Sequence, residues 1–236
     1  MSEAPAKALD ALCVVLPSYN PGPRLAPVVA GLQAVGAPFL LVDDGGTDGA
    51  VAALDLPEAQ VLRMPENRGK GHALLAGFQA ALESPACRAV CVVDADGQHN
   101  PADLPRFWAA FEAEQADLVL GVRNRAGSYV PLRSRFGNWL TIHVTAWLLG
   151  RRLPDTQCGF RLLSRAFAET VLAEVAGGRY ETEMEMLVLA MRRNVRIAQV
   201  PIATVYEAGN PSSHFQKVQD SWRIYRRLWQ AARKYR

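Results

Sequence analysis

Short apolar runs alternate with segments of helical periodicity through the first half of the chain, and this alternation most restricts the possible folds. The apolar runs predict strands at residues 12–16, 39–42, 61–64, 89–93 and 118–122. The segments between them predict helices at residues 24–35, 73–82 and 104–114. Strands that alternate with helices of this length indicate an α/β domain with a mostly parallel sheet covered by helices on both faces.

The second half of the chain has a less regular pattern. We expect helices at residues 138–149 and 181–193. Residues 155–161 form a polar turn that leads into a strand or a helix, and residues 195–206 contain a strand. The pattern shows no internal repeat, so the chain is not expected to be an array of similar units.

Length and composition favour one soluble domain. A chain of 236 residues, half of them hydrophobic, can bury a sizeable core. The four cysteines lack the paired spacing of a metal site, which is typical of a reduced cytoplasmic protein. The N-terminus lacks a secretory pattern, and the longest apolar stretch, residues 139–150, is too short to span a bilayer. We expect a flexible segment at residues 1–11 and a single domain at residues 12–215.

Positive charge is concentrated at the end of the chain. Residues 216–236 contain seven Lys or Arg and one Asp, whereas the net charge of the whole chain is only +3. Trp222, Tyr225 and Trp229 recur at helical spacing, with arginines on the other faces, and predict a basic amphipathic C-terminal helix. This helix either packs on the body or meets an anionic membrane surface. We expect a cytoplasmic protein, peripheral at the inner face of the membrane in the second case, and no nucleic-acid partner.

The segment DADGQH follows directly after the apolar run at residues 89–93. Alternation in an extended segment places Asp94 and Asp96 on the same side, and Gln98 follows in the same phase. Two carboxylates and an amide oxygen are a hard, oxygen-only ligand set that suits Mg²⁺ or Mn²⁺. The alternative is that the two aspartates form only a turn at the end of a strand.

Further polar turns end the first two predicted strands or begin a helix. Asp43 and Asp44 either accept hydrogen bonds from a nucleoside or only cap the turn DDGGTDG. The first strand ends in PSYN rather than in the glycine pattern of dinucleotide-binding folds, which argues against a dehydrogenase. The stretch GKGH at residues 69–72 precedes a helix and can approach an anion, but it lacks the P-loop spacing.

These stretches, in this order, resemble family 2 of the glycosyltransferases, which has the GT-A fold. The likeness extends over residues 12 to 225 and is strongest to the branch of dolichyl-phosphate mannose and glucose synthases. The matching stretches are VVLPSYN, LLVDDGGTDG, NRGKGHALLAGF, VVDADGQHNPADL, LVLGVRN, DTQCGFRLL, YETEMEML and VPIATVY. The resemblance implies a nucleotide-sugar half at residues 12–124 and an acceptor half at residues 125–215.

The resemblance also implies roles for matching residues. Contacts to the nucleotide sugar fall on Pro17, Tyr19, Asn20, Asp43, Asp44, Lys70, Asp94 and Asp96. Ligands for Mg²⁺ or Mn²⁺ fall on Asp96 and Gln98. Catalytic groups fall on Asp94, Arg123 and Arg133, and the groups that meet an acceptor phosphate on Arg133, Gln157, Arg161, His214 and Lys217. The chain departs from the family pattern at two places. Gly46 stands where a serine is usual, and Asn20 is followed by Pro21 and Gly22 instead of the acid that is usual soon after it.

The expected function is therefore an inverting transfer from a nucleotide-diphosphate sugar, UDP- or GDP-linked, to a polyprenyl phosphate or another lipid-linked acceptor. A phosphate acceptor is already anionic near neutral pH and needs no strong base. A hydroxyl acceptor of a glycan or glycolipid would need a carboxylate base, for which Glu181 and Glu183 are the candidates. Three functions from other classes remain as alternatives. They are a sugar-phosphate nucleotidyltransferase, a phosphatase with an aspartate nucleophile and a non-catalytic binding module. Oligomeric state is not indicated.

Overall fold

Seven strands form one sheet within the residues that the computed structural model describes, which are 9–123, 155, 158–179, 181–203, 230, 233 and 234. The order across the sheet is β3-β2-β1-β4-β6-β5-β7. The strands are β1 (Leu12–Ser18), β2 (Phe39–Asp43), β3 (Val61–Arg63), β4 (Ala89–Val92), β5 (Leu118–Arg123), β6 (Arg161–Ser164) and β7 (Ile197–Ile202). Neighbours pair in parallel except at β6, which runs antiparallel to both β4 and β5. The prediction of a mostly parallel sheet is confirmed.

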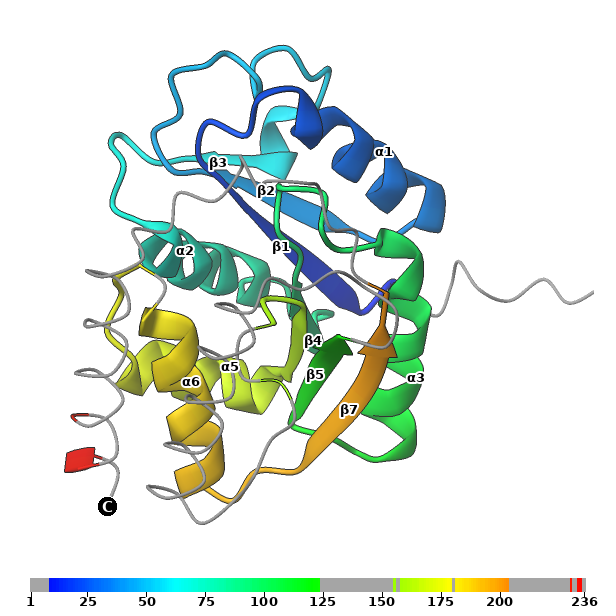
Figure 1. Cartoon of the computed structure of the whole chain (residues 1–236), viewed down its shortest axis with the longest axis vertical. Helices are drawn as coiled ribbons and strands as arrows, with labels where there is room; N and C mark the ends of the chain where they lie inside the picture. The colour runs from blue at the N-terminus through cyan, green and yellow to red at the C-terminus, as the bar shows by residue number, and fades with distance from the viewer. Residues whose placement is uncertain are drawn as a thin grey trace, which may run out of the picture.

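Helices cover both faces of this sheet, as the alternating pattern predicted (Figure 1). The helices are α1 (Leu25–Val35), α2 (Lys70–Leu82), α3 (Leu104–Ala113), α5 (Arg165–Glu174) and α6 (Glu181–Arg192). Short 3₁₀ turns are η2 (Gly22–Arg24), η3 (Glu58–Gln60) and η4 (Pro101–Asp103). Helices α1 and α3 pack in one apolar cluster, and α2, α5 and α6 pack in another. The sequence did not predict α5, and the helix predicted at residues 138–149 lies outside the described residues.

The side-chain alternation of the strands produces these two clusters. In β1, Val14 and Leu16 belong to the cluster on the side of α1 and α3, whereas Val15 belongs to the cluster on the side of α2. All three side chains are fully buried. Burial on both faces explains why β1 is an almost continuous apolar run rather than a polar and apolar alternation.

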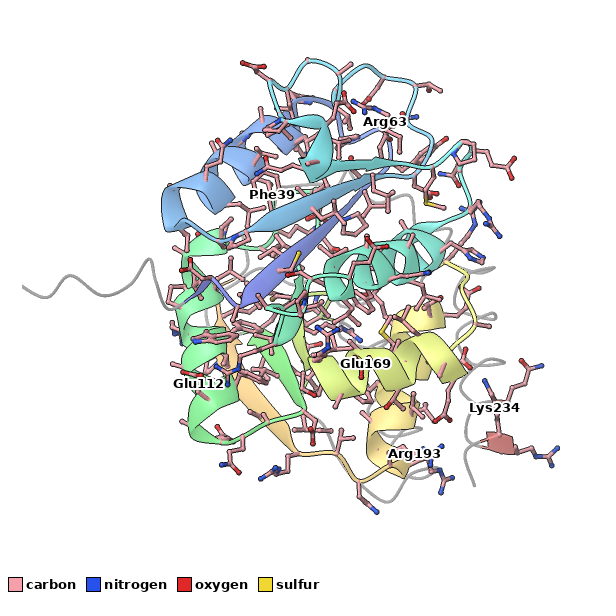
Figure 2. All side chains as sticks on the ribbon, turned by 180° about the vertical axis from the view of Figure 1, so that it is seen from behind. Phe39, Arg63, Glu112, Glu169, Arg193 and Lys234 are labelled. Carbon is pink, nitrogen blue, oxygen red and sulfur yellow. The ribbon has the colours of Figure 1, made fainter. Side chains whose placement is uncertain are left out.

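The ends of the domain show two contacts that bear on its boundaries. Leu9 is 1% exposed, so the packed core begins before residue 12. At the other end, Lys234 donates to the Glu174 carbonyl and lies 3.3 Å from a carboxylate oxygen of Glu185, beside α6 (Figure 2). Most of residues 216–236 lies outside the described residues, and the lipid contact of this segment stays a prediction. Among the described helices, none is both long and apolar enough to cross a membrane.

Helix α2 approaches the sheet closely because Gly77 has no side chain. A Cβ at this position would lie 2.4 Å from a methyl carbon of Val15 and 3.0 Å from one of Val42. We expect Gly77→Ala to lower the free energy of unfolding by about 1–2 kcal/mol, since overpacking outweighs the gain in helix propensity. Urea unfolding measures the change. The exposed Gln79→Ala on the same helix should change stability by less than about 0.5 kcal/mol. A Gly77→Ala protein of unchanged or higher stability would contradict the close approach.

Candidate active site

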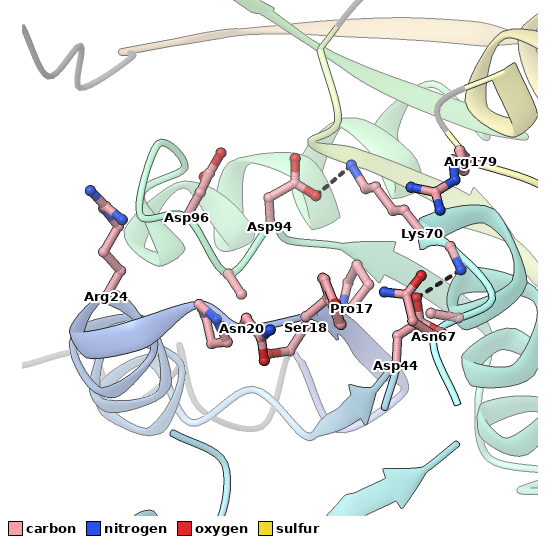
Figure 3. Close-up of a pocket in the computed structure, with 15 residues that line it drawn as sticks. Pro17, Ser18, Asn20, Arg24, Asp44, Asn67, Lys70, Asp94, Asp96 and Arg179 are labelled. Atoms are coloured by element: carbon pink, nitrogen blue, oxygen red, sulfur yellow. Dashed lines mark hydrogen bonds and ion pairs between the residues drawn. The ribbon is translucent and has the colours of Figure 1, made fainter. Parts of the chain in front are cut away.

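A cleft lies where β1, β2 and β4 end at the same edge of the sheet and α2 begins (Figure 3). In open α/β sheets this edge is where ligands bind. Among the residues predicted from the sequence to contact a nucleotide sugar, those that line the cleft are Pro17, Tyr19, Asn20, Asp44, Lys70, Asp94 and Asp96. The sheet therefore brings together segments that are up to 79 positions apart in the sequence (17 to 96).

Other predicted site residues lie elsewhere or are not described. Asp43, Gln98, Arg123 and Arg161 are described but are not part of the cleft lining. Arg133, Gln157, His214 and Lys217 lie outside the described residues, so their roles stay predictions.

The turn after β2 is held from two sides. Asn20 adopts a left-handed conformation (φ 46°), and its side-chain oxygen accepts hydrogen bonds from the backbone N–H groups of Thr47 and Asp48. Asp43 accepts from the N–H of Gly46 at 2.8 Å. A Cβ at Gly46 would lie 2.7 Å from that carboxylate oxygen, so the residue that departs from the family pattern gives Asp43 its room. Asn20 and Asp43 thus shape the turn.

Asp44 ties the turn after β2 to the start of α2. Its side chain is 2% exposed, and its two oxygens accept from the backbone N–H groups of Arg68 and Gly69, each at 2.8 Å. The register between Ser18 and Asp43 places this turn beside the end of β1. The carboxylate keeps lone pairs for a ligand in the cleft, because each oxygen can accept more than one hydrogen bond.

Lys70, the first residue of α2, joins two carboxylates from distant parts of the chain. Its Nζ lies 2.7 Å from Oδ1 of Asp94 and 3.2 Å from Oε2 of Glu183 in α6. Burial alone would lower the pKa of Lys70, but the charges of Asp94 and Glu183 raise it above its usual value. Burial would likewise raise the pKa of Asp94, but Lys70 holds it below its usual value. The Lys70 ammonium and the Asp94 carboxylate are therefore charged at neutral pH.

The segment 158–161 packs against this ion cluster from the second half of the chain. Arg161, 2% exposed, donates to the carbonyls of Cys158 and Glu183 at 2.7 and 2.9 Å. A Cβ at Gly159 would lie 2.5 Å from Oδ2 of Asp94. Burial raises the pKa of Cys158 to about 12, so this thiol is neutral and unsuited to nucleophilic attack. Arg161 acts as a buried anchor, and Gly159 gives the Asp94 carboxylate its space.

The segment after β4 turns sharply, with Gly97 at φ 77°. Oδ1 of Asp96 accepts from the backbone N–H of Gln98 at 2.9 Å, and the carboxylates of Asp94 and Asp96 point the same way (Figure 3). Burial raises the pKa of Asp96, and the neighbouring charge of Asp94 raises it further. The site thus holds two neighbouring acids, and within the described part of the chain no ion pair joins a cation to Asp96. Such an arrangement would be relieved by a bound metal ion.

Arg123, predicted as a catalytic group, forms a two-pronged ion pair. Its Nε and Nη2 donate to the two oxygens of Asp155 at 2.6 and 2.9 Å. Asp155 is 3% exposed, so the pair joins the end of β5 to the polar segment before β6. This arrangement gives Arg123 a structural role, and its predicted catalytic role stays a prediction.

Arg179 lines the cleft, and the sequence analysis did not select it. It lies in the loop between α5 and α6, which rests on the start of α2: the Gly71 N–H donates to the Gly178 carbonyl, and a Cβ at Gly69 would lie 2.8 Å from Cγ of Arg179. The Arg179 guanidinium forms no hydrogen bond or ion pair with another described residue, and it lines the same cleft as Lys70 (Figure 3). In the sequence, only the glycine pair directly before Arg179 could have pointed to this residue.

Comparisons with known proteins agree with this geometry. The model of the family described as glycosyl transferase family 2 matches residues 13–172, more than half of the chain. A UDP-N-acetylglucosamine–dolichyl-phosphate N-acetylglucosaminyltransferase of Methanococcus voltae is 28% identical over 82% of this chain and 85% of its own length. A polyprenol monophosphomannose synthase of Mycolicibacterium smegmatis is 31% identical over 80% of this chain and 75% of its own.

A solved structure shares the fold. The crystal structure of glucosyl-3-phosphoglycerate synthase from Mycobacterium tuberculosis with Mn²⁺ and UDP-glucose superposes with a TM-score of 0.70. The match covers 96% of this chain and 80% of that protein, at 20% sequence identity. The two proteins therefore share the fold, and the predicted domain boundaries stay predictions.

We expect Lys70 and Asp94 to stabilise each other. Lys70→Met should lower the free energy of unfolding by about 2 kcal/mol, because it leaves Asp94 and Glu183 without their shared counter-charge in a largely buried site. The double variant Lys70→Met/Asp94→Asn should lose less than the sum of the two single losses, by about 1 kcal/mol or more. Chemical unfolding of the four proteins measures this coupling.

The exposed pair Arg63–Glu58, at 2.5 Å, is the matched control. The same cycle there should give a coupling below about 1 kcal/mol, because solvent screens both charges. Additive losses at Lys70 and Asp94 would show that the two groups do not stabilise each other in the folded protein.

Proposed function

The chain belongs to glycosyl transferase family 2 and is a glycosyltransferase with the GT-A fold, and we propose that it transfers a sugar from a nucleoside-diphosphate donor to a polyprenyl phosphate. The observation that carries the donor half of the proposal is the cleft itself, in which Asp94 and Asp96 face Lys70 and Arg179 at the carboxyl edge of the sheet. The two relatives described above support the acceptor, because their names specify a dolichyl phosphate and a polyprenol monophosphomannose.

The nucleoside is proposed to lie against Pro17, Tyr19 and Asp44. Asp44 accepts hydrogen bonds and so suits an N–H of the base or a hydroxyl of the ribose. The adjoining Arg179 guanidinium, exposed at the cleft, provides donors for a carbonyl of the base or for a phosphate oxygen. Uracil and guanine both present an N–H beside a carbonyl, so UDP and GDP donors both fit this description.

A divalent cation, Mg²⁺ or Mn²⁺, is proposed to be held by Asp96 and Gln98, with Asp94 toward the donor. The residues fit such an ion, because two carboxylates and an amide oxygen are hard oxygen ligands that lie on one turn after β4. Among the described residues, no group of three or more His, Cys, Asp or Glu forms a complete cage. The remaining ligands would be water and diphosphate oxygens, as is usual for Mg²⁺. When bound, the ion neutralises charge on the leaving diphosphate.

The proposed chemistry is a single displacement with inversion. An oxygen of the acceptor phosphate bonds to the anomeric carbon on the face opposite the diphosphate, and the bond from that carbon to the diphosphate oxygen breaks. The acceptor oxygen is already anionic and needs no base. The structure favours this acceptor over a hydroxyl, because Glu183 contacts Lys70, and neither Glu181 nor Glu183 belongs to the described cleft lining. Arg133, His214 and Lys217 are proposed to meet the acceptor phosphate.

A transfer assay tests the proposed reaction. With Mn²⁺ and labelled UDP- or GDP-sugars, we expect label to move to a short-chain polyprenyl phosphate and a nucleoside diphosphate to be released. Sugar and glycolipid hydroxyl acceptors serve as the comparison. Transfer only to hydroxyl acceptors would overturn the proposed acceptor. Formation of a nucleotide sugar with release of inorganic diphosphate would instead identify a nucleotidyltransferase.

Thermal unfolding with UDP or GDP tests the metal site independently of turnover. At 100 times the dissociation constant, a ligand stabilises by about 2.7 kcal/mol, which corresponds to roughly 5–10 °C for a chain of this length. We expect this shift to require Mn²⁺ in the wild type and to be lost in Asp96→Ala. Glu112→Ala, at an exposed site on α3, should keep the full shift. An unchanged Mn²⁺-dependent shift in Asp96→Ala would show that Asp96 is not a metal ligand.

A further inference from the structure

His99 ends the DADGQH turn, and neither the sequence nor the proposed function gives it a role. The imidazole is 7% exposed, and its Nδ1 accepts the backbone N–H of Asp94 at 3.2 Å. This hydrogen bond closes the turn from its last residue back to its first. Since the N–H belongs to Asp94 itself, the bond fixes the backbone from which the first acid of the site projects.

The His99 ring is itself held by the segment before β6. Its plane stacks on Phe160 with ring centroids 5.2 Å apart and an interplanar angle of 29°. Phe160, fully buried, stacks in turn on Phe107 of α3 with centroids 4.1 Å apart. The neighbouring Gly159 lies against the Asp94 carboxylate, where a Cβ would come within 2.5 Å of Oδ2. Residues 159 and 160 therefore contact both ends of the turn.

We propose that His99 is a positioning residue for the metal and the donor diphosphate, and that Gly159 and Phe160 form the support on which it holds the turn. The imidazole combines a flat face for stacking with an sp² acceptor for the Asp94 N–H, and no other side chain supplies both in this geometry. Without the acceptor, the Asp94 N–H loses its partner in a buried site and the turn can relax. The spacing of the Asp94 and Asp96 carboxylates then changes. This inference rests on the proposed function.

Three substitutions separate the two contacts of His99. His99→Phe keeps a ring on Phe160 and removes the acceptor. His99→Asn keeps an acceptor near the position of Nδ1 and removes the ring, and His99→Ala removes both. The readout is the affinity for Mn²⁺ in the presence of saturating UDP or GDP, measured from the electron paramagnetic resonance signal of free Mn²⁺. The KM for the nucleotide sugar and kcat are measured alongside.

We expect His99→Phe and His99→Ala to weaken Mn²⁺ binding by about 10–100-fold, the usual loss when a partner of a metal-binding group is removed. His99→Asn should lose less than His99→Phe, no more than about threefold, because it keeps the acceptor that fixes Asp94 and loses only the stacking on Phe160. The KM for the donor should rise in parallel in the Phe and Ala variants. This pattern, with folded proteins by circular dichroism, supports the positioning role.

Asn100→Ala is the matched control, because Asn100 is exposed and adjoins His99, and its side chain accepts from the N–H of Ala102 in η4. It should lower the melting temperature slightly and leave Mn²⁺ affinity unchanged. Wild-type affinity in His99→Phe would overturn the inference, as would an equal loss in His99→Asn or in Asn100→Ala. If the wild type failed to bind Mn²⁺ both with UDP and with GDP present, that result would instead contradict the proposed function itself.

Discussion

The contact of Lys70 with two carboxylates is the interaction on which the site depends. Asp94 follows β4 in the first half of the chain, and Glu183 lies in α6 in the second, so one ammonium group links the two halves. Removing an ammonium from water is costly, and the two acids offset that cost. The same contacts fix the direction of Asp94 at the edge of the cleft. Stability and site geometry therefore share one buried cluster of charges.

Glycines make this close association possible. Segments from the second half reach the start of α2 only because Gly69 and Gly71 have no side chains. A Cβ at Gly71 would lie 2.0 Å from the Thr182 hydroxyl oxygen, and one at Gly69 would lie 2.9 Å from the Gly178 carbonyl. The GKG stretch, which resembled a weak anion-binding loop in the sequence, thus has a packing function as well. It brings Lys70 to the cleft and seats the loop that carries Arg179.

Much of the fold and part of the site could be predicted from the sequence, for physical reasons. Apolar runs predicted β1, β2 and β4, and acidic turns follow the second and third of these strands. The family resemblance placed Asp44 and Asp96 among the contacts of one nucleotide sugar, and the carboxyl ends of parallel strands do meet at one edge of the sheet. The antiparallel insertion of β6 was not predictable, because its four residues give no period and its direction is set by pairing with β4 and β5. The roles of His99 and Glu183 depend on partners 61 and 113 positions away (99 to 160, 70 to 183), which local patterns do not encode.

The charges that line the described cleft indicate why a divalent ion belongs to the proposed reaction. Three acids, Asp44, Asp94 and Asp96, face three cations, Arg24, Lys70 and Arg179, and their formal charges cancel. A diphosphate ester carries about two negative charges, and a divalent cation would bring two positive ones, so the two together leave the balance unchanged. A diphosphate alone would have to enter beside two carboxylates. The proposed acceptor phosphate would then need cations of its own, and the basic groups predicted beyond β5 are suited to supply them.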